Sequence, residues 1–304
     1  MVKLRLRHTI EQNSWDKPGD MPELIYRLYS SRGIKSAEEY RAFVEEDSKR
    51  LWQQLHDPFG LSDMKAAVET ILEAVKSGTG ICVYGDCDAD GVCASAILYM
   101  YLKRIGAEKL RVYLPSRGEE GYGLNESAID EIAGEYKLLV SVDCGITAVD
   151  EVEYARSLGI EVVITDHHAC KEALPAAAAV VDPHRPDCPY PFKGLAGVGV
   201  ALKLAMAVAG PEQAQRVFDR YRDLAAVGTV ADVMPMVGEN RAIVSLGLQD
   251  MNPPRRLGLA KLVECAGIGE KPITSVSVGY TVAPRINASG RMGCAMAAAE
   301  LLLT

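Results

Sequence analysis

The sequence predicts an α/β protein with a doubly wound, mostly parallel sheet, a helical segment after it and a small helical appendage at the N-terminus. Between residues 80 and 183, short apolar runs alternate with helical patterns, as in a parallel sheet covered by helices. Polar clusters rich in acid or histidine follow three of these runs, and beyond residue 183 the pattern is helical. We therefore expect the appendage over residues 1–60, the α/β core over 61–195 and a helical completion of that core over 196–304.

The appendage is charged, and its pattern is mostly helical. Ser36 with Glu39 three residues later is a capping-box pattern, which predicts the start of a helix. Asp57, Pro58 and Gly60 indicate a turn. We expect Ser62 to cap the next helix, which should end near residue 77.

Five apolar runs predict buried strands, at residues 81–84, 110–115, 137–142, 161–165 and 179–181. Helical patterns at 92–105, 126–132 and 147–158 separate the first four runs. Strands that alternate with helices in this way pair in parallel through right-handed connections.

Four prolines between residues 183 and 193 predict a loop after the last strand. Helical patterns follow at residues 199–209, 211–226, 240–251, 257–266 and 294–303. The sequence stops inside the last of these patterns, and we interpret it as a fragment of a longer protein.

Composition limits the possible classes of protein. The 304 residues can bury a sizeable core, and the net charge of −8 argues against a general DNA-binding protein, although a local basic groove remains compatible with it. The eight cysteines form no CxxC pair, so neither a zinc ribbon nor a disulfide framework is indicated. No stretch has the length or apolar character of a signal peptide or a membrane span, so we expect a cytoplasmic protein without membrane contact.

The strand-end clusters carry the candidate chemistry. Asp86, Asp88 and Asp90 alternate after the first strand, and on an extended loop alternate side chains point the same way. Three close carboxylates repel one another unless a cation lies among them. The alternative is a calcium-like loop or a solvated turn, but a calcium EF-hand needs Glu at its twelfth position, where this chain has Ile97.

Two further clusters follow later strands. Asp143 ends a strand that is otherwise apolar or small, so its carboxylate needs a partner. Asp166, His167 and His168 follow the next strand; adjacent side chains diverge, so one imidazole can bind a metal while the other faces a substrate, with Asp166 orienting a ring. A structural histidine pair is the alternative. Carboxylates and imidazole with few thiols suit Mn²⁺ or Mg²⁺.

These motifs resemble those of the DHH phosphoesterase superfamily and, within it, the RecJ single-strand-specific exonucleases. The resemblance covers nearly the whole chain from about residue 58. It rests on GDCDADG at 85–91, PSRGEEGYGL at 115–124, SVDCGIT at 141–147, TDHH at 165–168, VDPHRPDCPYP at 181–191, LAGVGVALKLA at 195–205, GTVADVMPMVGENR at 228–241 and APRINASGRM at 283–292. Family members normally continue into a DHH-associated domain and an OB-like module, and both are missing from this sequence.

The resemblance implies a centre with two ions, Mn²⁺ or Mg²⁺. It assigns one ion to Asp86, Asp88 and Asp143, and leaves open which of Asp86 and Asp88 is the closer ligand. It assigns the other ion to Asp90, Asp143, His167 and Asp232, so that Asp143 bridges the two. His168 would contact the scissile phosphate, which makes His168 and Asp143 the candidate catalytic residues. Asp232 taken alone could equally be a helix cap.

Four more residues are candidates for binding substrate beside His168: Arg117, Arg285, Asn287 and Arg291. Guanidinium groups suit phosphate contact, and the alternative for each of these arginines is an ordinary surface residue. Tyr122 could stack a base or pack its own loop. Backbone N–H groups at Gly197 and Gly199 could cradle a phosphate, or these glycines could allow close packing.

The implied function is a metal-dependent 5′-to-3′ exonuclease that degrades single-stranded DNA in repair or recombination, with single-strand-binding and recombination proteins as further partners. Single-strand preference and polarity come from the resemblance alone. One alternative is a phosphodiesterase for short oligonucleotides or cyclic dinucleotides. The other is a fragment that lacks its substrate-gripping domain and is not catalytic.

Overall fold

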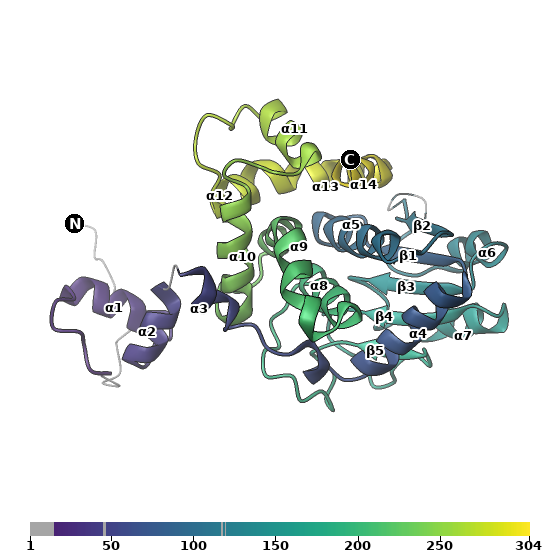
Figure 1. Ribbon diagram of the computed structural model, residues 1–304, viewed down its shortest axis with the longest axis horizontal. Helices are drawn as coiled ribbons and strands as arrows, with labels where there is room; N and C mark the ends of the chain where they lie inside the picture. Colours follow the sequence, from purple (N-terminus) through teal and green to yellow (C-terminus); the bar gives the residue numbers. More distant parts are fainter. Residues whose placement is uncertain (1–14, 45–46, 117, 119) are drawn as a thin grey trace, which may run out of the picture. The chain divides into compact units, whose positions relative to one another are not determined.

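The computed structural model describes residues 15–44, 47–116, 118 and 120–304. The chain divides into two compact units, Met1–Gln54 and Leu55–Thr304, and Figure 1 shows the elements of each. None of the helices in the described part combines the length and the apolar character that a membrane span requires.

The described residues of the first unit form three short helices, α1 (Glu23–Ser31), α2 (Ala37–Val44) and α3 (Ser48–Trp52). Its small core gathers around Trp15, whose ring stacks on Tyr40 at 5.8 Å between centroids. The Ser36 hydroxyl accepts the Glu39 N–H at 3.0 Å, as predicted. The Glu39 carboxylate, however, accepts the N–H of Lys35 rather than that of Ser36, one residue further back than a capping box requires.

The second unit contains a five-stranded parallel sheet in the order β2-β1-β3-β4-β5 (Figure 1). The strands are β1 (Ile81–Gly85), β2 (Leu110–Tyr113), β3 (Leu138–Val142), β4 (Glu161–Thr165) and β5 (Ala179–Val181). All five predicted strands are therefore confirmed, and every neighbouring pair is parallel. The order reverses next to β1, because β2 and β3 lie on its two sides, and chemistry gathers at such a point in open α/β sheets.

Helices cover both faces of this sheet. On one face, Tyr84, Leu139 and Ile164 pack in a core with α6 (Glu126–Ala133) and α7 (Val149–Ser157). Residues that alternate with these point to the other face. There α5 (Ala89–Arg104) contacts β1 and β2, α8 (Gly197–Ala209) contacts β3 and β4, and α4 (Met64–Ser77) contacts β5.

The predicted cap of α4 is wrong. Asp63, in the left-handed region at φ 58°, holds the N-cap position, and no side chain accepts a hydrogen bond there. Ser62 follows the short 3₁₀ turn η1 (Pro58–Gly60), and its hydroxyl donates to the carbonyl of Asp187 at 3.4 Å. A contact across 125 residues therefore replaces the local cap that the sequence pattern predicts.

The helical part completes the same unit. Helices α8, α9 (Pro211–Ala231) and α10 (Gly238–Asp250) pack on one another, and α11 (Leu257–Cys265) and α14 (Ala295–Leu303) follow. Helix α9 runs five residues past its predicted end at residue 226. It continues through Gly228, where a Cβ would lie 2.8 Å from Val198 of α8, so packing and not propensity decides its length.

Residues 275–291 form helices that the sequence did not predict: α12 (Ser275–Ser277), the π-helical turn η2 (Val278–Val282) and α13 (Ala283–Arg291). The motif APRINASGRM at 283–292 therefore lies almost entirely on a helix. Pro284 is in the first turn of α13, where a proline needs no N–H partner.

A buried charged network joins the helices to the beginning of this unit. Glu239 on α10 is fully buried, and its carboxylate lies 3.3 Å from the ammonium of Lys203 on α8. The Tyr190 hydroxyl donates to the same carboxylate at 2.8 Å, and the Lys203 ammonium donates to the carbonyl of His56 at 2.6 Å. Burial lowers the pKa of Lys203, whereas Glu239 raises it.

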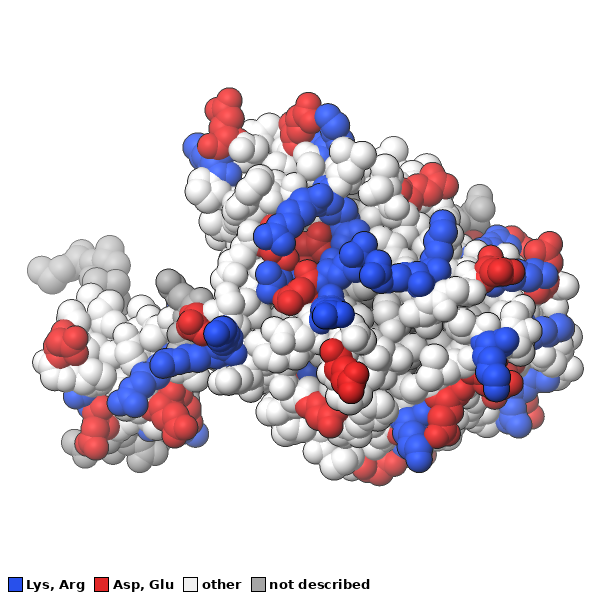
Figure 2. All heavy atoms as spheres, viewed as in Figure 1, with Lys and Arg blue, Asp and Glu red and all other residues white. Residues whose placement is uncertain are grey.

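Charges on the face shown in Figure 2 are mixed, with Lys and Arg gathered where Figure 1 draws α5 and α9. Two nearby arginines are already paired: Arg222 lies 2.7 Å from Asp250, and Arg256 lies 3.1 Å from Asp223. Because acids compensate these guanidinium groups, we assign no phosphate-binding role to them.

Candidate metal centre

Strand register places the acidic residues side by side. Gly85 of β1 pairs with Val142 of β3, which pairs with Thr165 of β4. The next residues along the three strands are Asp86, Asp143 and Asp166, so all three carboxylates leave the same edge of the sheet. The polar clusters that follow the first, third and fourth strands therefore meet at the carboxyl edge of the sheet.

The first cluster departs from its predicted shape. Asp88 caps α5, since its Oδ1 accepts the N–H groups of Asp90 at 2.9 Å and Gly91 at 3.1 Å. The helix thus begins at Ala89, three residues earlier than predicted, and Asp90 lies in its first turn. Of the three aspartates expected to alternate on an extended loop, Asp86 and Asp88 lie together, but Asp90 does not, because a helix rotates successive side chains by about 100°.

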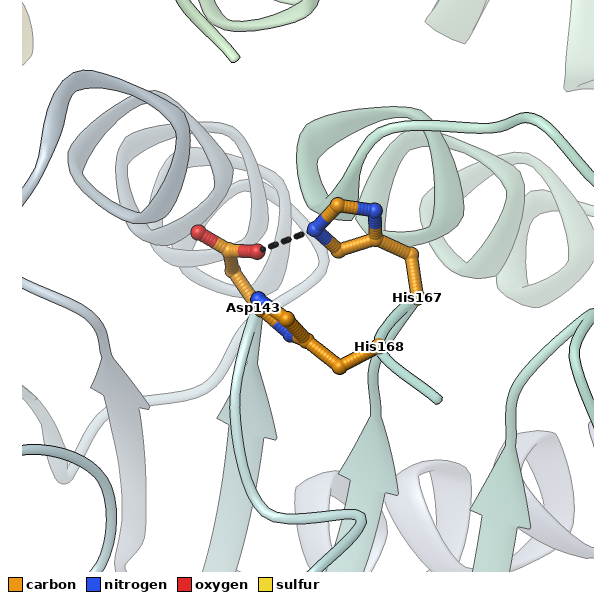
Figure 3. A group of neighbouring side chains, drawn as sticks. All are labelled: Asp143, His167 and His168. Carbon is orange, nitrogen blue, oxygen red and sulfur yellow. Dashed lines mark ion pairs between the residues drawn. The ribbon is translucent and has the colours of Figure 1, made fainter. Parts of the chain in front are cut away.

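The acids divide instead into two groups whose ligand atoms lie within 4.8 Å of one another. Asp86 and Asp88 lie with Asp143 in one group, and Asp90 lies with His167 and Asp232 in the other. The Nε2 atom of His167 is 3.1 Å from Asp143 Oδ1, 3.6 Å from Asp232 Oδ2 and 4.0 Å from Asp90 Oδ2. Figure 3 shows Asp143 and His167 pointing toward each other. Asp143 therefore adjoins both groups.

Unpartnered polar atoms indicate a cation among these side chains. Asp143 Oδ1 and His167 Nε2 are buried and, despite their 3.1 Å separation, neither has a hydrogen-bond partner. Burial and the neighbouring His168 lower the pKa of His167 to about 4, so the ring is neutral at pH 7 and the pair is not a salt bridge. Burial and nearby carboxylates hold the pKa of Asp143 and of Asp90 well above their usual range. These oxygen and nitrogen donors fit Mn²⁺ or Mg²⁺.

Helix α8 stabilises the charge of Asp90. The Gly197 N–H donates to Asp90 Oδ2 at 2.8 Å, and the Val198 N–H donates to Oδ1 at 3.0 Å. The N-terminus of a helix favours negative charge. These two N–H groups bind a carboxylate of the chain and not a phosphate. Close packing explains why residue 197 is a glycine, since a Cβ there would lie 2.2 Å from Asp143 Oδ1.

His168 lies at the exposed side of the buried group, and the ligand atoms of Asp143, His167 and His168 lie within 4.8 Å of one another (Figure 3). The Nδ1 of His168 lies 2.7 Å from Asp166 Oδ1, and the Asp166 carboxylate also accepts the N–H groups of Ile146, His167 and His168. The hydrogen bond to Asp166 raises the pKa of His168 to about 9, against the effect of burial. Asp166 therefore orients His168, and the half-exposed ring is positively charged at pH 7.

Asp232 reaches the site from the C-cap of α9. Burial, followed by the charge of Asp88, raises its pKa to about 6. The next residue, Val233, is exposed and has φ 56°, an unfavourable region for a β-branched side chain. The chain thus turns sharply after placing the carboxylate, and strain of this kind is concentrated at functional sites.

The matching family model is described as the DHH family, N-terminal domain, and it covers residues 80–229. The chain belongs to the DHH family. It is 39% identical over its whole length to the single-stranded-DNA-specific exonuclease RecJ of Bacillus subtilis strain 168 and 37% identical over 99% of its length to that of Escherichia coli strain K12. It spans only 38% and 53% of these two relatives.

A solved structure supports the fold of this DHH domain. A crystal structure of exonuclease RecJ bound to manganese matches with a TM-score of 0.71 and 37% identity, over 80% of this chain and 61% of the other. The family model ends before Asp232, whereas both RecJ relatives align with nearly the whole chain, including α13.

The structure describes three of the four other residues that were expected to bind substrate. Arg117 falls outside the described residues. Arg285 is exposed, and its guanidinium donates to the Thr281 carbonyl at 2.8 Å on the preceding turn. Arg291 is exposed at the end of α13. Asn287 contacts residues 86–90, which carry Asp86, Asp88 and Asp90 and are called the aspartate loop below. Its Oδ1 accepts the Ala89 N–H at 2.7 Å.

Asp182 is a residue that sequence reasoning missed. Thr165 pairs with Val181 of β5, so Asp182 follows its strand beside Asp166. Its side chain is fully buried, its Oδ2 has no hydrogen-bond partner, and burial raises its pKa to about 7. The signal was available, because Asp182 ends an apolar strand as Asp86, Asp143 and Asp166 do.

Proposed function

We propose that this chain carries the catalytic centre of a metal-dependent exonuclease that hydrolyses single-stranded DNA from the 5′ end. One observation carries the proposal: two clusters of candidate metal ligands lie at the carboxyl edge of the sheet, and Asp143 adjoins both of them. The names of the RecJ relatives support single-stranded DNA as the substrate. The 5′ polarity, the cytoplasmic location and the partnership with repair and recombination proteins rest on the sequence arguments above.

Two divalent ions are proposed as cofactors. Asp86, Asp88 and Asp143 would hold one ion, and Asp90, Asp143, His167 and Asp232 the other. Bound in this way, divalent ions supply an activated water and neutralise charge on the departing oxygen. The chain contributes a neutral His167 imidazole, a desolvated Asp143 carboxylate and, through Asp166, a protonated His168 ring that can donate to a non-bridging phosphate oxygen.

Saturating Mg²⁺ is expected to stabilise the protein more at pH 8 than at pH 6. The pKa values of Asp90, Asp143 and Asp232 are raised in the folded protein, that of Asp232 to about 6. In the metal-free protein, these groups therefore stabilise the fold at low pH, and this stabilisation is lost as the pH rises through their pKa values. Mg²⁺ binds only the deprotonated carboxylates, so it should offset this loss more at pH 8 than at pH 6. His168, with a pKa of about 9, adds a further loss above neutrality. The melting temperature measured with and without Mg²⁺ at both pH values tests this. An equal shift at pH 6 and pH 8 would contradict it.

The exonuclease proposal is tested with Mn²⁺ and single-stranded DNA labelled at its 3′ end. Stepwise shortening from the unlabelled end is expected. His168→Ala should slow it by about a hundredfold or more, because a donor to the reacting phosphate is lost. Mn²⁺ binding by His168→Ala, measured separately, should be unchanged because His168 is not among the proposed ligands.

The same assay separates the alternatives. Cleavage of a dinucleotide without shortening of the long strand would favour a phosphodiesterase for short oligonucleotides. Bound Mn²⁺ with no hydrolysis of either substrate would overturn the proposal for this chain and favour a catalytically incomplete fragment.

A further inference from the structure

Helix α13 touches the aspartate loop at two points. The Oδ1 of Asn287 accepts the Ala89 N–H at 2.7 Å, across 198 residues of sequence. One turn later, the backbone of Gly290 lies so close to the loop that a Cβ would be 2.2 Å from the Cys87 carbonyl oxygen. Both contacts fall on residues that stand between the metal-ligand candidates Asp86, Asp88 and Asp90.

The contact from Asn287 completes the cap of α5. The first N–H groups of a helix have no partner within the helix. Asp88 accepts two of them, those of Asp90 and Gly91, and Asn287 accepts the one before, that of Ala89. The cap is therefore shared between a residue inside the loop and a residue of a distant helix.

This cap determines where the carboxylates lie. The bonds to Asp90 and Gly91 fix the Asp88 side chain, and the helical start at Ala89 turns Asp90 away from Asp88 into the second ligand group. If the Ala89 N–H lost its partner, the first turn of α5 would be free to loosen, and both ligand groups would lose part of their preorganisation.

We propose that Asn287 is a positioning residue that holds the aspartate loop from α13 and thereby sets the affinity of the site for divalent metal. This role differs from the direct substrate contact expected for Asn287, since it uses the amide oxygen, which binds the Ala89 N–H. It rests on the proposed metal centre, but it requires neither DNA nor catalysis.

Other residues of α13 do not share the role. Arg285, two positions before Asn287, does not share its helix face, and its guanidinium binds the Thr281 carbonyl of its own helical segment. The Ser289 hydroxyl donates to the carbonyl of Ile286 at 2.7 Å, also within α13. Ser289 therefore provides a matched control, a polar side chain of the same helix that does not bind the loop through its hydroxyl.

The test measures Mn²⁺ affinity without DNA, from the signal of free Mn²⁺ in electron paramagnetic resonance. Asn287→Ala is expected to weaken binding by about tenfold or more, as removal of groups that orient metal ligands does. Asn287→Asp keeps an acceptor oxygen at the same place and should bind Mn²⁺ at least as tightly as the wild-type chain. Ser289→Ala should also bind as the wild type does. Metal-free melting curves show whether each variant is folded.

The outcomes separate this inference from the proposed function. Equal Mn²⁺ affinity in Asn287→Ala and the wild type would overturn the inference alone, as would a weakened affinity for DNA with unchanged Mn²⁺ binding. Loss of affinity in Asn287→Asp equal to that in Asn287→Ala would also overturn it, because the acceptor oxygen would then not matter. A wild-type chain that does not bind Mn²⁺ would overturn both proposals.

Discussion

Replacing Asp143 with asparagine is expected to lower the rate of phosphodiester hydrolysis by about a thousandfold. Asp143 adjoins both ligand groups, so the change weakens both proposed metal positions at once. Metal ions contribute several kcal/mol to stabilising the transition state, and about 4 kcal/mol corresponds to this factor. The single-turnover rate with saturating Mn²⁺ measures the effect.

The same variant should unfold at a higher temperature than the wild type when metal is removed. Burial, followed by the charges of Asp90, Asp88 and Asp166, raises the pKa of the Asp143 carboxyl group and destabilises the charged form. Asn removes that charge and tolerates the backbone angle of φ 60° at this position. Glu135→Gln, an exposed change on the same unit, is the control and should alter neither rate nor stability. A variant that keeps a tenth of the rate, or that is less stable in EDTA, would contradict the prediction.

Replacing Lys203 with methionine is expected to lower the free energy of unfolding by about 3–5 kcal/mol, the range for breaking a buried ion pair by removing one partner. The change leaves the Glu239 carboxylate buried without its cation and removes the hydrogen bond to the His56 carbonyl. Urea denaturation of the metal-free protein measures the loss. Hydrolysis is not involved, so the prediction is independent of the proposed function.

Two variants check the physical reason. Lys261→Met removes an exposed lysine paired with Glu264, and it should change the free energy of unfolding by no more than about 0.5 kcal/mol. Adding Glu239→Gln to Lys203→Met removes the stranded charge and keeps an acceptor for Tyr190, so it should recover part of the loss. A double variant less stable than Lys203→Met would show that the unpaired charge of Glu239 does not cause the loss of stability.

Local patterns were enough to predict the sheet. Its strands are short apolar runs between turns and helices, and the burial of each run is visible in its composition. Residues 275–291 were missed because Pro284, Gly290 and the surrounding small and polar residues have low helix propensity. Packing of α13 on α5 and α9 outweighs that preference.

The donor groups of the candidate centre, and the edge of the sheet at which they meet, could be predicted from local sequence, because residues that directly follow parallel strands share one edge. The division of those donors into two groups was implied by the family resemblance, but the contacts that produce it are visible in the folded chain alone. The cap at Asp88 turns Asp90 away, and α8 binds Asp90 from 107 residues along the chain. Asn287 holds Ala89 from 198 residues away. Local sequence cannot specify such contacts, because each depends on packing between elements that are neighbours only in the folded chain.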